Sequence, residues 1–315
     1  IMQRDYQSLL DHLGSGKDWD MGRRLGGLRM LPPFGLPEYH QGDYTGTIEA
    51  LNAVSTYVRE LNAKYIVVMH GNTAANLDLR AAIVRHLKSG AEITAICTES
   101  TPDYRHHRYL VDADGFARSI IFHQTDAAEG VASLEAYIIS KELLVSMMDA
   151  CAAARHYHFH RDAIAEYLAA GGRVNVYLHC GYGKRIMNTE SYFKAGMDML
   201  DPKNRAELFP SDRPVRTKSH ADVSTYYGED SVCRNSLAAD GCIIEGEIEN
   251  CILFSDVRVG KGAKLKNCIL MRGCVVGEGV ILSNVIADKD VGISSYQTLM
   301  GSAKLPIVIP KSSKI

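Results

Sequence analysis

The segment 69–78 (MHGNTAANLD) contains the residues that are best placed for chemistry. It follows the apolar run 64–68, which predicts a buried strand that ends in a glycine turn. Enzymes of the α/β class usually carry their chemistry on such turns. Asn72 stands just past the turn, however, and no carboxylate follows until Asp78. The segment alone leaves open whether the chain performs a reaction or only keeps the shape of a protein that does.

Three histidines alternate in the segment RHYHFHRD, and their spacing raises the question of a metal site: His156, His158 and His160. No carboxylate or cysteine completes a ligand set there, so we predict no metal site. Basic residues gather nearer the N-terminus: Lys17, Arg23, Arg24 and Arg29. A solvated loop is the favoured interpretation of this group, and a site for a phosphate effector or for an acidic partner surface is the alternative.

Composition excludes several classes of function. The 315 residues contain 35 basic and 37 acidic side chains, which is not the basic surplus of a nucleic-acid-binding protein. No apolar run reaches the roughly 18 residues of a membrane span, and none of the eight cysteines forms a C-x-x-C pair. We therefore expect a soluble, cytoplasmic chain without a membrane or nucleic-acid partner. The chain begins as if within a helix, so we also expect a missing upstream segment.

The hydrophobic pattern predicts two domains with different periodicities. Between about 40 and 200, strand-like and helix-like segments alternate, which favours an α/β domain over 1–200 with a mostly parallel sheet. Residues 201–240 are rich in Pro, Ser and Asp and are predicted to be a linker. The remainder, 241–315, changes to a short repeat.

The repeat predicts a left-handed parallel β-helix. Asparagines recur with a period of 17 at 250, 267 and 284. Apolar residues recur every six positions, and we expect them to point into the core: Val257, Ala263, Ile269, Val275 and Ile281. Such a hexapeptide pattern, with glycines in the turns, is typical of stacked coils that bury their inner residues only against one another.

Several segments resemble glucose-1-phosphate adenylyltransferases. They are 8–21, 43–72, 181–200, 213–217 and 235–260, of which 43–72 and 181–200 are similar to that family's W-Y-R-G-T-A-D-A-V and Y-W-R-D-V-G motifs. The resemblance covers nearly the whole chain. It implies a nucleotidyltransferase-like α/β domain with a C-terminal β-helix, and a Mg²⁺-dependent reaction of ATP with glucose 1-phosphate in glycogen biosynthesis.

The chain departs from the family where the resemblance places the metal ligands. The aspartate of the family's A-G-D-H motif corresponds to Asn72, and that of Y-W-R-D-V-G corresponds to Arg185. An amide binds Mg²⁺ poorly and a guanidinium repels it, so no cofactor and no catalytic residue are predicted. Arg185 itself is either a new anion ligand or, as we favour, a surface arginine.

The sugar-phosphate side of the pocket departs as well. The resemblance places Gln124 and Thr125 at the family's Glu and Lys, and Tyr109 and Glu135 at two glycines; an anionic Glu135 would oppose a sugar phosphate. The whole vestigial pocket implied by the resemblance is Tyr44, Gly46, Gly71, Asn72, Tyr109, Gln124, Thr125, Ser133 and Glu135. The family's glycine-rich nucleotide loop has no counterpart in this sequence.

These departures resemble the non-catalytic, GlgD-type auxiliary subunits of the family. The resemblance then implies a catalytic adenylyltransferase subunit as partner, in a heterotetramer, with a homo-oligomer as another possibility. One alternative is an active enzyme with relocated metal ligands, for which Asp78 and Glu190 are the nearest carboxylates. A second is a hexapeptide acyltransferase, although such enzymes usually need more coils and no histidine follows His220.

Overall fold

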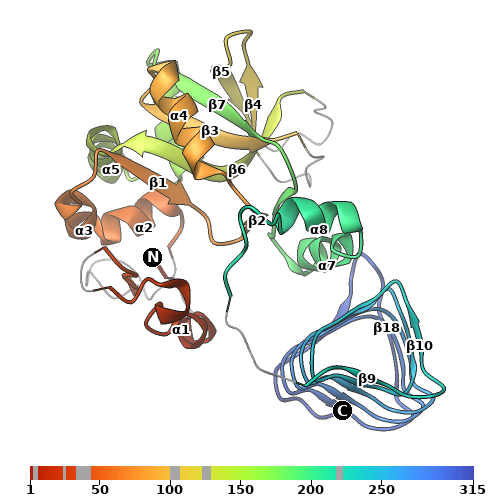
Figure 1. The fold of residues 1–315 in the computed structure, drawn as a ribbon. Coiled ribbons are helices and arrows are strands. Elements are labelled where there is room, and N and C mark those ends of the chain that lie inside the picture. Colours follow the sequence, from red (N-terminus) through yellow and green to blue (C-terminus); the bar gives the residue numbers. More distant parts are fainter. Residues whose placement is uncertain (3–5, 24–25, 33–43, 100–106, 123–128, 218–222) are drawn as a thin grey trace. The chain divides into compact units, whose positions relative to one another are not determined.

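The computed structural model describes the chain except for residues 3–5, 24–25, 33–43, 100–106, 123–128 and 218–222 (Figure 1). The chain divides into two compact units. Unit 1 comprises 1–73, 77–183 and 216–218, and unit 2 comprises 74–76, 184–215 and 219–315. Within the described ranges, every helix is too short or too polar to cross a membrane.

Unit 1 is an α/β domain, as predicted. Its helices are α1 (Gln7–Leu13), the 3₁₀ turn η1 (Lys17–Trp19), α2 (Thr47–Ala53), α3 (Ser55–Glu60), α4 (Leu79–Ser89), α5 (Lys141–Ala154), the π-helical turn η2 (Phe159–Ile164) and α6 (Ala165–Ala169). Its strands are β1 (Tyr65–Met69), β3 (Ile93–Thr98), β4 (Arg108–Val111), β5 (Ala117–Ile121), β6 (Val131–Ser140) and β7 (Val174–His179).

The sheet of unit 1 has the order β5-β4-β6-β3-β7, and β1 also pairs with β6. Strand β3 runs parallel to β7, whereas β6 runs antiparallel to β1, β3 and β4. The strands β1, β3, β4 and β7 therefore share one direction, and β6 is reversed among them. The sheet is thus parallel with a reversed central strand, because strand direction depends on how the connections fold and leaves no mark in the hydrophobic pattern.

Strand β6 forms the centre of the core of unit 1. Eight consecutive residues of β6 are buried, as are all six of β3, which is typical of strands covered on both faces. Helix α5 follows β6 directly and packs on it, and its first turn is capped by Ser140, whose hydroxyl accepts a hydrogen bond from the Leu143 amide. Helix α4 packs on β3 and β7.

Unit 2 begins with short elements: β2 (Thr73–Ala75) and β8 (Gly183–Arg185), which pair with each other, then α7 (Thr189–Asp198) and α8 (Pro202–Leu208). Asn188 and Ser191 form a reciprocal capping box at the start of α7. Phe193 of α7 packs on Ile269 and Ile286, which fixes the helix against the β-helical coils.

The coils of unit 2 form a parallel β-solenoid of short strands (Figure 1). They are β9 (Tyr226–Tyr227), β10 (Val232–Arg234), β11 (Leu237–Ala238), β12 (Ile243–Ile244), β13 (Glu247–Glu249), β14 (Ile252–Leu253), β15 (Arg258–Val259), β16 (Lys264–Leu270), β17 (Val275–Val276), β18 (Ile281–Ala287), β19 (Gly292–Ile293), β20 (Thr298–Met300) and β21 (Ile307–Ile309). Val232 pairs with Glu247, and then Glu247 with Lys264 and Lys264 with Ile281. The coil length is therefore 15 residues at the first step and 17 afterwards. Helix α8 and strands β9 to β11 lie within 201–240, the range that the sequence had indicated as a linker.

The apolar ladder in the solenoid differs from the predicted one at two positions. Val275 and Ile281, expected inside, are 47% and 42% exposed. A coil of 17 residues cannot keep a strict six-residue step, so one step in each coil shortens to five. The interior ladder is Cys251, Val257, Ala263, Cys268, Cys274, Val280, Val285 and Val291.

The asparagines of the repeat form a ladder along the solenoid. Asn250, Asn267 and Asn284 all have φ of 52°, the left-handed conformation that asparagine tolerates better than most residues. The Asn250 amide donates to Asn267 Oδ1 at 3.3 Å, and the Asn267 amide donates to Asn284 Oδ1 at 3.4 Å. Asn235 begins this ladder and donates to Asn250 Oδ1 at 2.7 Å. The 17-residue period does not reveal Asn235 because the first coil is shorter.

Candidate functional site

A β-bulge in strand β6 places Glu135 in unit 1. The pairing of β3 with β6 jumps from Ile96 opposite Ala136 to Cys97 opposite Ser133, so Leu134 and Glu135 are extra residues on the β6 side. Glu135 has φ of 48°, which costs a residue other than glycine or asparagine about 1–2 kcal/mol. Bulges of this kind re-aim side chains, often beside functional sites.

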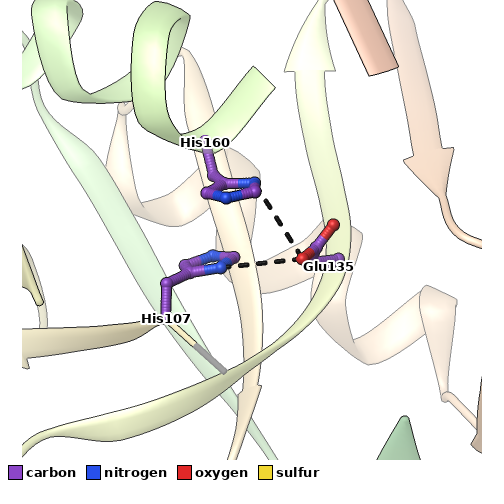
Figure 2. Close-up of side chains that lie close together, drawn as sticks. All are labelled: His107, Glu135 and His160. Atoms are coloured by element: carbon purple, nitrogen blue, oxygen red, sulfur yellow. Dashed lines mark ion pairs between the residues drawn. The ribbon is translucent and has the colours of Figure 1, made fainter. Parts of the chain in front are cut away.

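Three histidines surround the buried carboxylate of Glu135 (Figure 2). Its Oε2 lies 3.0 Å from His70 Nε2. Its Oε1 lies 3.7 Å from His107 Nδ1 and 3.9 Å from His160 Nδ1. The rings of His107 and His160 stack with centroids 4.2 Å apart and an interplanar angle of 6°. A carboxylate that is only 4% exposed is therefore surrounded by imidazole nitrogens.

A hydroxyl network lies behind this cluster. The Tyr137 hydroxyl is 2.9 Å from His107 Nε2 and 3.3 Å from Ser133 Oγ, and it accepts a hydrogen bond from Tyr109 at 3.5 Å. Ser133 Oγ in turn accepts the backbone N–H of Glu135 at 3.0 Å. Burial raises the pKa of both Tyr109 and Tyr137 well above that of an exposed phenol, so both remain neutral.

The alternating histidines do not gather as a group. His156 Nδ1 lies 3.0 Å from the Glu166 carboxylate, and the His158 and His160 rings are 6.3 Å apart. His160, on the π-helical turn η2, instead faces His107 and Glu135. The expectation that no carboxylate completes a ligand set around these histidines was wrong for His160, because Glu135 comes from a strand that is distant in sequence.

The predicted pocket residues near the end of β1 occupy varied environments. Asn72 is half-buried, and Gly71 is exposed with open space where a Cβ would stand. At Gly46, by contrast, a Cβ would lie 2.2 Å from the backbone oxygen of Tyr157, so only glycine fits. Tyr44 is half-buried, and burial raises its pKa, as does the nearby Glu49 carboxylate.

Arg185 is not the surface side chain that the sequence favoured. It is 6% exposed and belongs to unit 2, whereas Asn72 belongs to unit 1. An amide and a guanidinium do not make a Mg²⁺ donor set, because hard Mg²⁺ prefers anionic oxygen. We therefore derive no step through Mg²⁺ at these two positions.

Some predicted residues lie outside the described ranges: Gln124, Thr125 and Arg24. In the basic N-terminal group, Arg23 pairs with Asp20 at 2.7 Å, and both side chains are largely exposed. Local ion pairing of this kind is consistent with the solvated loop that the sequence favours.

Sequence reasoning missed two members of the cluster, His70 and His107. The available signals were weak: a histidine directly after the first strand, and the HH pair at 106–107. The replacement of a family glycine by Glu135 was noticed, but its interpretation was limited to repulsion of a phosphate. The partners of Glu135 come from β1, β4 and η2, and only folding brings these elements together.

Comparisons with known proteins give a consistent family. Residues 221–302 match the family described as "GlmU-like, C-terminal hexapeptide". The chain is 34% identical over 306 residues to the "Glycogen biosynthesis protein GlgD" of Bacillus subtilis (strain 168), covering 97% of this chain and 79% of that protein. It is 31% identical to the protein of the same name from Geobacillus stearothermophilus, covering 82% and 65%. It is 29% identical to the "Glucose-1-phosphate adenylyltransferase" of Geobacillus stearothermophilus, covering 82% and 68%.

Proposed function

The chain belongs to the family of the glycogen biosynthesis protein GlgD, and on that premise we propose that it is an auxiliary subunit of a glucose-1-phosphate adenylyltransferase. In this proposal it is itself catalytically weak or inactive. It acts in the cytoplasm on a catalytic subunit, in a hetero-oligomer that we expect to be a tetramer. The observation that carries the proposal is the likeness to the Bacillus subtilis relative over nearly the whole chain.

The Glu135 site supports the proposed loss of activity. The resemblance assigns this position to a glycine that lies close to the sugar phosphate, whereas Glu135 is a buried carboxylate. Its partners hold it by contacts from several elements, so it cannot simply swing out of the pocket. A fixed carboxylate opposes the phosphate of a sugar phosphate, because like charges repel strongly away from water.

The alternative with relocated metal ligands finds no support in the positions of the spare carboxylates. Asp78 caps helix α4 by accepting the backbone N–H groups of Arg80 and Ala81, each at 3.1 Å. Glu190 pairs with Lys194 at 2.7 Å and belongs to unit 2, whereas Asp78 belongs to unit 1. Both carboxylates have local structural roles. No observation favours the acyltransferase alternative over the adenylyltransferase family.

Helix α4 offers a surface for the proposed partner. Ile83, Val84 and Leu87 are 36%, 51% and 54% exposed and lie on one side of the helix, because their spacing is one helical turn. An apolar group at this spacing on an exposed helix is typical of a protein contact. We propose that this group contacts the catalytic subunit.

The proposal is tested by measuring ADP-glucose formation from ATP, glucose 1-phosphate and Mg²⁺. The purified chain is assayed alone and then mixed with the catalytic subunit from the same genome. We expect no turnover alone, and raised turnover or an altered effector response in the mixture. Robust turnover by the chain alone, abolished by Asn72→Ala, would refute the inactive-subunit proposal.

A pair of variants separates assembly from catalysis. Val84→Glu places a charge in the apolar group on α4 and should weaken co-purification with the catalytic subunit, together with the effect on turnover. Gly71→Ala, in open space, is the matched control and should leave both unchanged. Undiminished co-purification of Val84→Glu would exclude α4 as the contact surface without touching the family assignment.

A further inference from the structure

We propose that His107, Glu135 and His160 form a binding site for a divalent transition-metal ion of the Zn²⁺ class. Each residue offers one ligand atom, and these atoms all lie within 4.8 Å of one another. Among the described residues, this is the group of histidine, cysteine and carboxylate side chains that meets this distance condition. The inference goes beyond the proposed function and does not depend on it.

The distances fit two ligands of one ion better than direct hydrogen bonds. Glu135 Oε1 lies 3.7 Å from His107 Nδ1 and 3.9 Å from His160 Nδ1, and both are longer than an N–H···O hydrogen bond. Ligands at about 2.0–2.2 Å from a tetrahedral Zn²⁺ are roughly 3.3–3.5 Å apart. The cluster therefore needs to contract by only a few tenths of an ångström, with a small tilt of the two stacked rings (Figure 2).

The donor set selects the kind of ion. Two imidazoles and one carboxylate are the three protein ligands of many zinc sites that keep a fourth position open. Imidazole nitrogen suits Zn²⁺, Co²⁺ and Ni²⁺, whereas Mg²⁺ and Ca²⁺ prefer oxygen. The ion would therefore differ in class from the Mg²⁺ of nucleotidyl transfer. The His160 side chain is 24% exposed, against 3% for His107 and 6% for Glu135, so an ion can enter from its side.

Outer contacts orient the ligands as they do in metal sites. His107 turns Nε2 to the Tyr137 hydroxyl at 2.9 Å, which leaves Nδ1 facing Glu135. The second carboxylate oxygen of Glu135 is held by His70 Nε2 at 3.0 Å, and the same nitrogen lies 2.8 Å from Thr47 Oγ1. Metal-ligating histidines typically use their second nitrogen in this way, and carboxylate ligands are themselves hydrogen-bonded.

Two local irregularities of the backbone meet at this cluster. Glu135 sits in a bulge with positive φ, and His160 sits on a π-helical turn. Both features cost free energy and are over-represented at functional sites. Strain that converges on one cluster from two separate elements is an independent reason to assign it a ligand.

The test is titration of the metal-stripped full chain with Co²⁺, followed by displacement with Zn²⁺. Bound Co²⁺ is detected by its visible d–d absorption. We expect one Co²⁺ per chain, fully displaced by Zn²⁺ and not by Mg²⁺. Glu135→Gln and His160→Gln should each weaken binding by more than the roughly 10–100-fold that loss of an outer partner costs. Tyr137→Phe removes such an outer partner and should weaken binding about tenfold.

The matched control is His156→Gln, since His156 pairs with Glu166 outside the cluster. It should bind Co²⁺ as the unaltered chain does. Because Glu135 is buried and its variant can misfold, the partly exposed His160 provides the second test, and far-UV circular dichroism verifies folding of both. Absence of Co²⁺ binding, or binding that survives His160→Gln in a folded chain, would overturn the proposal.

Discussion

Truncating Val280 should destabilise the solenoid more than truncating its larger neighbour Ile281. Val280 is completely buried in the interior ladder, whereas Ile281 is 42% exposed. Val280→Ala removes two buried methyl groups, worth about 1.6 kcal/mol at roughly 0.8 kcal/mol each, and leaves a small cavity. We expect a cost of about 2–3 kcal/mol, because a rigid coil stack closes such a cavity only partly. Ile281→Ala should cost less than about 1 kcal/mol, because much of its side chain is already in water.

Hydrogen exchange of the full chain measures this difference where it arises. Backbone amides of β16 and β18 pair with each other, so their protection reports the stability of these two coils. A loss of about 2–3 kcal/mol corresponds to exchange that is roughly 30–150-fold faster in the regime where reclosing outpaces exchange. Ile281→Ala should change these rates less than about fivefold.

The reversed order would refute the register of the solenoid. A strict six-residue ladder places Ile281 inside and Val280 outside, and it predicts the larger loss for Ile281→Ala. The two substitutions are adjacent in sequence, so differences in coil position or local mobility cannot explain a reversal.

Other substitutions test local backbone geometry and burial. Asn267→Ala keeps φ of 52° without the tolerance of asparagine and loses two ladder hydrogen bonds, so hydrogen exchange in β16 should report a cost of about 1–2 kcal/mol. Gly46→Ala forces a Cβ to within 2.2 Å of the Tyr157 oxygen and should lower stability in urea by roughly 1–3 kcal/mol, whereas Gly71→Ala should stay within about 0.5 kcal/mol; equal values would contradict the close approach. Of the eight free cysteines, two are exposed: Cys180 and Cys233. Mass spectrometry after alkylation of the folded chain at mildly alkaline pH should find only these two modified. The other thiols are shielded by burial, which for Cys151 also raises the pKa to about 11 and keeps the thiol protonated; their labelling before unfolding would contradict the burial.

The sequence by itself determined the class of the fold. Alternating apolar segments predicted the α/β domain, and the Asn period of 17 predicted a solenoid whose coils indeed repeat every 17 residues from Glu247 onward. These features depend on local periodicity, which folding cannot alter without exposing the apolar residues. The family resemblance, carried by segments spread over the chain, agrees with the comparisons.

The tertiary structure alone decided strand direction, side-chain facing and the candidate site. The reversal of β6 depends on its connections, and the exposure of Val275 and Ile281 depends on a five-residue step that a six-residue count overlooks. The cluster around Glu135 joins residues from three elements separated by tens of positions. Sequence spacing records only near neighbours along the chain. A buried carboxylate acquires its partners from whichever strands and turns pack against it, so its chemistry is set when the chain folds.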